Sequence, residues 1–190
     1  MKKNSFMRFV LICTGLFIIS FASSAQEKYF TRSGKIQFFS KTKAENIDAT
    51  SRSAAVVLDS KTGDLQFAVL MKGFEFKKAL MQEHFNKEYI ESDKFPKAEF
   101  KGQITNNADI KYTTDGTYPA KVKGKLTIHG ETKDIETTGI ITVKSGKIIT
   151  TSTFNIQLPD YKIKVPSVTR SQISDDIKIT IDCSLEVLKQ

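Results

Sequence analysis

The sequence predicts an all-β domain, a barrel or a sandwich of antiparallel strands with one inserted helix. Three observations predict this fold class. Apolar and polar residues alternate with period two over several segments, which is typical of strands with one buried face. Short turns separate most of these segments, and short connections favour antiparallel pairing. One segment near the middle of the chain has helical spacing instead.

The first 25 residues have the pattern of a secretory signal peptide. Basic residues precede an apolar run, residues 9–21, which is shorter than the ~20 residues that a membrane-spanning helix needs. Small residues follow, and Ala25 precedes the expected cleavage site before Gln26. We therefore expect a signal peptide over residues 1–25 and a domain over residues 26–190, periplasmic or otherwise exported. An uncleaved signal anchor is the alternative interpretation.

Composition and charge narrow the function classes. With 39% hydrophobic and 26% charged residues, the chain resembles neither a disordered protein nor a multi-span membrane protein. The formal charge is +8, but few of the 29 basic residues are arginine, the residue that nucleic-acid readers favour. We therefore expect no nucleic-acid partner. The expected mature chain keeps one cysteine, Cys183, so an intramolecular disulfide is excluded.

The first half of the mature chain contains four predicted strands. Ile36 and Phe38 mark the first strand, and the fourth follows Pro96 at residues 100–104. Between them, residues 55–58 and 65–71 flank a turn at residues 59–64.

The segment Lys77–Glu91 predicts a helix of about four turns. Its residues are helix formers, and Met81, Phe85 and Tyr89 recur at intervals of four on one face. Pro96 closes the region, because proline cannot continue a helix.

The second half of the chain shows the clearest alternation. Residues 177–187 alternate strictly and place Cys183 on the apolar face. Gly124 occupies an inward position in an earlier strand, which indicates a bend or close packing. Residues 105–116 are the most loop-like part of the chain. The other strands predicted here are 121–128, 135–143 and 148–158, joined by turns at His129-Gly130 and Ser145-Gly146.

Two strings of residues resemble conserved blocks of the YceI-like family. The first, Met81–Gly102, contains Glu83-His84-Phe85 and then Phe95-Pro96 ahead of Phe100. The second contains GKLTIHGETK at residues 124–133, which is similar to the hairpin of that family. The resemblance covers most of the expected mature chain. It implies a lipocalin-like antiparallel β-barrel of about eight strands with one inserted helix, and a long apolar cavity.

The resemblance also implies a binding function without catalysis. Members of the family bind polyisoprenoid or other amphiphilic chains, so we expect such a lipid, or a quinone, as ligand and no separate cofactor. The head group is expected near His84 or Asn86. The apolar chain is expected to contact nine residues: Phe67, Phe74, Phe76, Phe85, Phe100, Leu126, Ile128, Phe154 and Ile156.

Two other functions stay open at this point. The aromatic residues can equally fill a closed core, which would give a stress-related interaction or scaffold domain without a lipid ligand. An enzyme that acts on an isoprenoid head group through Glu83 and His84 is the third hypothesis. The two histidines, His84 and His129, lack metal-ligand spacing, so no metal is expected. We expect no stable membrane insertion, and a homodimer is compatible with the sequence.

Overall fold

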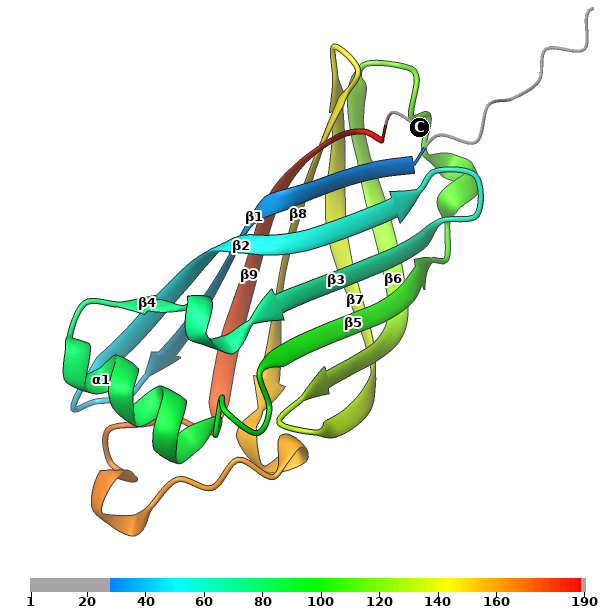
Figure 1. Ribbon diagram of the computed structural model, residues 1–190. Helices are drawn as coiled ribbons and strands as arrows, with labels where there is room; N and C mark the ends of the chain where they lie inside the picture. The colour runs from blue at the N-terminus through cyan, green and yellow to red at the C-terminus, as the bar shows by residue number, and fades with distance from the viewer. Residues whose placement is uncertain (1–27, 189–190) are drawn as a thin grey trace, which may run out of the picture.

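Eight antiparallel strands close into a barrel in the computed structural model, which describes residues 28–188 (Figure 1). The strand order is β1-β9-β8-β7-β6-β5-β3-β2, and pairing of β1 with β2 closes the ring. An additional short strand, β4, pairs with β2. The strands are β1 Lys28–Lys41, β2 Asn46–Asp59, β3 Asp64–Leu70, β4 Glu75–Phe76, β5 Lys97–Ile104, β6 Gly116–Ile128, β7 Glu131–Lys144, β8 Lys147–Gln157 and β9 Asp176–Val187.

The closure through β1 decides between the two all-β architectures that alternation alone allows. β1 pairs antiparallel with β2 on one side and with β9 on the other. The ring therefore has no free edge at its first strand, and the predicted barrel is confirmed. All of the predicted strands are present, whereas β4 was not predicted because two residues are too short to show alternation.

Two tight turns set the register of the β6–β7–β8 meander. His129-Gly130 and Ser145-Gly146 all have positive φ, between 51° and 77°. Positive φ at both central residues is the type I′ geometry, whose twist matches that of the flanking strands. In the second position this conformation favours glycine, because glycine has no Cβ to clash. The predicted turns are therefore confirmed.

The predicted helix is present but shorter, and its second half is not α-helical. α1 spans Ala79–His84, and the π-helical turn η2 follows at Phe85–Tyr89. The Ile90 N–H donates to the Phe85 carbonyl at 2.9 Å, the wider spacing that defines a π-turn. The expected bounds, Lys77–Glu91, are corrected to Ala79–Tyr89. A spacing of four residues does not distinguish the two helix types.

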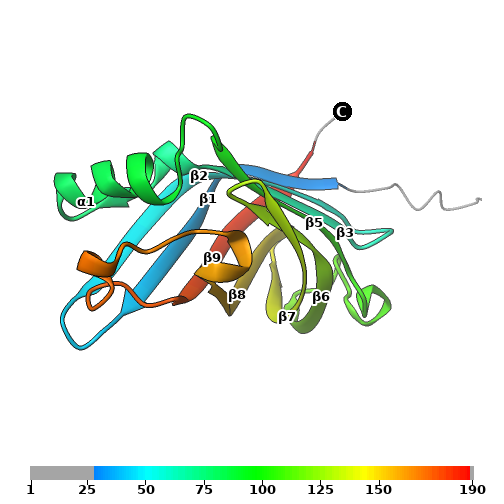
Figure 2. The same ribbon diagram turned by 90° about the horizontal axis from the view of Figure 1, so that it is seen from below.

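Four short 3-10 helices complete the described chain. These helices are η1 Met71–Gly73, η3 Asn107–Asp109, η4 Leu158–Tyr161 and η5 Ser167–Thr169. η3 lies in the predicted loop between β5 and β6. η4 and η5 lie in the long β8–β9 connection, which Figure 2 shows at the same end of the barrel as α1. Within residues 28–188, no helix has the length and apolar character to cross a bilayer.

A pair of glycines lets β5 and β6 approach closely inside the barrel. Gly102 lies opposite Gly124 in the register of the two strands. A Cβ atom on Gly124 would lie 2.5 Å from the Gly102 Cα and 2.6 Å from the Phe100 Cζ. The Phe100 ring therefore lies over the two glycines, and the close packing expected at Gly124 is confirmed.

We predict that Gly124→Ala lowers the free energy of unfolding by about 1–3 kcal/mol, because the new methyl group would meet main-chain atoms that have to move. Urea unfolding measures the loss. Gly116→Ala is the matched control, since its Cβ would meet only the Tyr118 side chain. Equal stability of the two variants would contradict the close approach.

Cys183 is a buried, unreactive thiol on the inner face of β9. Its side chain is 1% exposed, and a Cβ atom on Gly34 would lie 2.7 Å from its Sγ. Burial raises the pKa of the Cys183 thiol to about 11, because the thiolate would lose its hydration. The sulfur is therefore a small apolar packing group in the folded protein.

The raised pKa predicts a loss of stability in alkaline solution. The unfolded thiol ionises near its ordinary value, about 8.5, whereas the folded thiol stays protonated until a pH of about 11. The contribution of this thiol to stability is fully present below the pKa of the unfolded thiol. It is lost as the pH rises from that value through the pKa of the folded thiol. Urea unfolding of the wild type and of Cys183→Ala, measured between these two pH values, checks the predicted loss of stability. We expect a steeper fall in the wild type; parallel curves would contradict the assignment.

Candidate functional site

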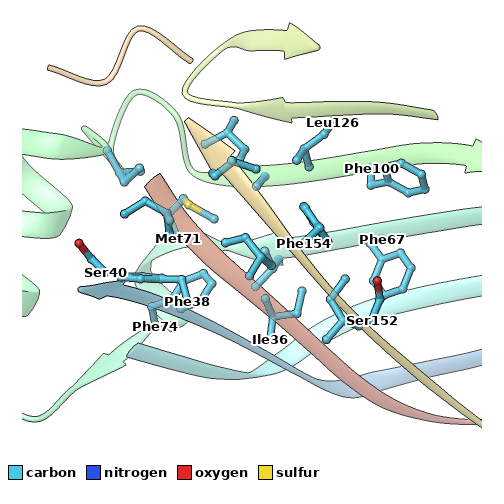
Figure 3. Close-up of a pocket in the computed structure, with 18 of the residues that line it drawn as sticks. Ile36, Phe38, Ser40, Phe67, Met71, Phe74, Phe100, Leu126, Ser152 and Phe154 are labelled. Carbon is cyan, nitrogen blue, oxygen red and sulfur yellow. The ribbon is translucent and has the colours of Figure 1, made fainter. Parts of the chain in front are cut away.

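The barrel contains a cavity of about 490 Å³. This volume is within the range of about 300–1,000 Å³ that is typical of small-molecule sites. In Figure 3, Ser40, Phe38, Phe74 and Met71 lie toward one end of the cavity, and Phe67, Phe100 and Ser152 toward the other. The cavity therefore runs lengthwise between the strands.

Strand alternation explains why the wall is apolar. On β9 the inward residues include Ile177, Ile179 and Ile181, and all three line the cavity. The inward residues Ile148 and Leu185, further along β8 and β9, are completely buried, whereas Ile179 and Ile181 are only partly buried. The interior is therefore packed solid near the β7–β8 hairpin and hollow toward α1.

The structure places all nine apolar residues expected at a ligand chain on the cavity wall. Their contact with a ligand stays a prediction. They come from five strands, from the β3–α1 connection and from η2. The nine are Phe67, Phe74, Phe76, Phe85, Phe100, Leu126, Ile128, Phe154 and Ile156.

The two residues expected at a head group lie in different places. His84 lines the cavity, and its Nδ1 is 3.4 Å from the Glu88 Oε2. Asn86 is not part of the wall, and its side-chain amide donates to the Gln82 carbonyl at 2.8 Å. Residues two apart lie on different faces of a helix, so the structure does not bring Asn86 to the cavity with His84.

Several wall residues were missed from the sequence. Phe38 is the most central of these, because its ring packs against Phe74, Phe76 and Phe85. The signal was present in the alternation of Ile36, Phe38 and Ser40 and in that of β9. Other wall residues that were not predicted include Ile36, Val69, Met71, Ile90, Ile163, Ile173, Ile179 and Ile181.

An aromatic cluster docks the helix onto the barrel. The Phe85 ring lies 5.0 Å from Phe76, 5.4 Å from Phe38 and 5.9 Å from Phe74, measured between ring centroids. Such pairs contribute about 0.5–1.5 kcal/mol each beyond the burial of area. Met81 and Tyr89, on the same face as Phe85, also line the cavity. The face predicted from the spacing of four is therefore the face toward the cavity.

The ionisable residues of the wall are all near α1 and are paired. They are Glu45, Lys78, His84 and Glu99. Lys78 Nζ is 2.7 Å from the Glu45 Oε1, and Lys97 Nζ is 3.0 Å from the Glu99 Oε1. Each cation on this rim thus has an acidic neighbour, and the wall beyond it is apolar or carries hydroxyl groups.

At the opposite end of the barrel, the β5–β6 connection packs against β1 through an aromatic pair. Tyr112 stacks on Tyr29 with ring centroids 6.2 Å apart. The Tyr112 hydroxyl donates to the Asn107 Oδ1 at 2.7 Å, and burial raises the pKa of this hydroxyl. Asn107 in turn donates to the Ser60 carbonyl at 2.9 Å. The β2–β3 turn and the β5–β6 connection are thereby joined across this end.

His129 holds three segments together beside the α1 end. Its Nε2 is 3.0 Å from the Glu91 Oε2, its Nδ1 is 3.1 Å from the Tyr161 carbonyl oxygen, and Phe95 packs on its ring at 4.4 Å. The β6–β7 turn is thus tied to the segment after η2 and to η4.

Glu83 and His84 do not form an acid–base pair at the cavity. Glu83 is not part of the cavity wall, and its Oε1 accepts from Lys87 Nζ at 2.7 Å, a bond that lowers the pKa of the Glu83 carboxyl. Within residues 28–188, no cluster of three or more His, Cys, Asp or Glu side chains is placed to hold a metal ion.

The chain matches the YceI-like domain model over residues 19–185. It belongs to the YceI-like domain family. The first strand lies inside this match, as do the GKLTIHGETK hairpin and nearly all of the cavity wall. The resemblance predicted from the sequence is therefore confirmed. No curated protein matches the chain.

Solved structures share the fold of this YceI-like chain. A polyisoprenoid-binding domain from Saccharophagus degradans, implicated in plant cell wall breakdown, has a TM-score of 0.75 at 12% identity and covers 86% of this chain and 99% of its own. BcnA from Burkholderia cenocepacia has a TM-score of 0.65 at 16% sequence identity, and the match covers 80% of this chain and 95% of BcnA. The YceI protein of Campylobacter jejuni has a TM-score of 0.55 at 21% sequence identity, and the match covers 73% of this chain and 81% of the YceI protein.

We predict that His129→Ala lowers the free energy of unfolding by about 1–3 kcal/mol, because it leaves the buried Tyr161 carbonyl without its partner. Urea unfolding checks this. His84→Ala is the matched control, since the His84 side chain is 40% exposed and a surface change of this kind costs less than about 0.5 kcal/mol. A loss no larger at His129 than at His84 would contradict the role of His129.

Proposed function

We propose that this protein is an exported binding protein that sequesters or carries a polyisoprenoid or a similar amphiphilic lipid, without catalysis. One observation carries the proposal: inward-facing apolar side chains, such as Phe38, Phe67 and Phe154, stay partly accessible around a cavity of about 490 Å³. Burying such a surface against a ligand chain is favourable, at about 0.8 kcal/mol per CH₂ group removed from water. A closed-core scaffold would have filled this space with side chains.

The cavity volume supports a chain of moderate length. An engineered cavity of about 150 Å³ holds one benzene molecule, so a cavity of about 490 Å³ holds roughly twenty carbon atoms on the same scale. Four isoprene units have this size. A longer chain would extend past the rim near α1.

Export is part of the proposal and rests on the sequence pattern of residues 1–25, in which basic residues, an apolar run and small residues precede Gln26. The proposed signal peptide, residues 1–25, lies outside the described residues.

The absence of catalysis is a proposal that rests on the wall chemistry. The side chains around the centre of the cavity are apolar or carry hydroxyl groups, and Glu83 is turned toward Lys87. No observation favours the enzyme hypothesis. We likewise expect no cofactor other than the bound lipid.

Mass spectrometry of an organic extract tests the proposal. The protein is expressed with its own leader in a bacterial host and purified without detergent, beside Phe67→Asp and the outward-facing control Gln66→Asp. We expect about one equivalent of a polyprenyl or similar lipid in the wild type and the control. We expect none in Phe67→Asp, because a carboxylate in the apolar wall is costly to desolvate. Extracts without lipid from all three folded proteins would contradict a carrier role.

A further inference from the structure

The ladder between β7 and β8 stops halfway along the two strands. β7 stays paired with β6 from Glu131 to Val143, and β8 stays paired with β9 from Ile148 to Gln157. The two strands pair with each other only from Gly139 opposite Ser152 to Lys144 opposite Lys147. Figure 1 shows them leaving their shared hairpin together and diverging toward the α1 end. We name the space between residues 131–138 and 153–157 the β7–β8 split.

Small residues and one side-chain hydrogen bond form the apex of the β7–β8 split. The Ser152 hydroxyl donates to the Thr138 carbonyl at 2.7 Å, just beyond the last main-chain pair. A Cβ atom on Gly139 would lie 2.7 Å from the Thr151 carbonyl oxygen, so the strands are in close contact there. Below this point the facing main-chain groups of β7 and β8 no longer pair with each other.

The wide end of the split is covered by η4. Leu158 and Ile163 are buried and line the cavity beneath it. The Tyr161 carbonyl is held by His129, and Lys162 Nζ is 2.7 Å from the Glu131 Oε1. The split is therefore bounded on three sides and faces the cavity.

Hydroxyl groups gather on the cavity wall at the apex. Thr137, Thr150 and Ser152 all line the cavity, among the isoleucines and phenylalanines of the neighbouring strands. The Thr150 Oγ1 is buried and has no hydrogen-bond partner within residues 28–188. Such a group costs free energy until something pairs with it. A ligand oxygen at the apex would supply this partner.

The charges around the split favour an uncharged ligand group. Lys133 is the basic residue of the split itself and lies toward its wide end. Around the apex, neither residues 134–143 of β7 nor residues 148–157 of β8 include a lysine or an arginine. The ionisable residues of this part of β7 are Asp134 and Glu136, which are paired with Lys125 and Lys123 on β6. A phosphate or carboxylate at the apex would be desolvated without a counter-charge, which is costly.

We propose that the polar end of the ligand binds at the apex of the β7–β8 split, and that this end is an uncharged oxygen, a hydroxyl or a ketone. The Thr150 hydroxyl pairs with the ligand oxygen, and the Ser152 Oγ, whose hydrogen is donated to the Thr138 carbonyl, accepts from the ligand where the polar end is a hydroxyl. The apolar chain runs along the cavity toward the aromatic cluster at Phe38 and Phe85. This assignment rests on the proposed lipid-binding function. It differs from the sequence-based expectation, which places the head group near His84.

Binding of three probes to the purified protein tests the assignment. The probes are geranylgeraniol, geranylgeranyl phosphate and the hydrocarbon phytane, each measured by displacement of the fluorescent dye N-phenylnaphthylamine. In the wild type we expect geranylgeraniol to bind most tightly. Thr150→Val should weaken geranylgeraniol about tenfold and leave phytane unchanged, because it removes one hydrogen bond and keeps the shape of the side chain.

The same variant should be more stable than the wild type in urea, because it removes a buried hydroxyl that has no partner. Thr153→Val is the matched control, the same chemical change at an exposed position of β8, and should alter neither affinity nor cavity binding. This combination of higher stability and weaker alcohol binding distinguishes a ligand contact from a folding defect.

Four results would overturn the assignment and leave the lipid-binding function standing. Geranylgeraniol could bind Thr150→Val as tightly as the wild type, or geranylgeranyl phosphate could bind the wild type more tightly than the alcohol. In the third result, His84→Ala and not Thr150→Val weakens the alcohol, which would return the head group to the α1 end. If phytane binds and the alcohol gains nothing over it, the head-group site alone fails. If none of the probes binds, the lipid-binding function fails with it.

Discussion

Closure of the barrel through β1 is the constraint on which the rest of the structure depends. Because β1 pairs with both β2 and β9, alternate residues of every barrel strand have to share one enclosed interior. Crowding in that interior is relieved where side chains are small. Gly34 makes room for Cys183, and Gly102 and Gly124 make room for Phe100. Most of the remaining inward residues are large and apolar, and they leave a cavity.

Much of the fold could be predicted from the sequence, because a strand that is buried on one face carries a visible period of two. The helix could be placed from Met81, Phe85 and Tyr89, but its π-helical half could not, since one spacing fits both helix types. β4, η4 and η5 escaped prediction because they are short and are held by tertiary contacts. The pairing of β1 with β2 and β9 distinguishes a barrel from a sandwich, and no local sequence pattern encodes this pairing.

The sequence predicts which side chains of the candidate site point inward, but it does not predict that they leave a cavity. Alternation indicates which way Phe67 or Phe154 points, yet the same residues would serve a filled core. The position of Asn86 could not be inferred from the resemblance to the family, because its amide satisfies the helix itself. Phe38 could be assigned to the first strand from the alternation of residues 36–40, but its packing against the helix depends on tertiary contacts that no local pattern encodes. The β7–β8 split depends on where two ladders part, which only the register reveals.

The interior packed around Ile148 and Leu185 closes one end of the cavity and makes it a blind tube. An elongated occupant cannot be pushed out from behind by a newcomer at that end. Exchange between two chains is therefore sequential: the first has to withdraw along most of its length before the second can reach full depth. For the carrier role proposed above, turnover would be set by how fast the bound lipid leaves, and an excess of fresh lipid in solution would not hasten that departure.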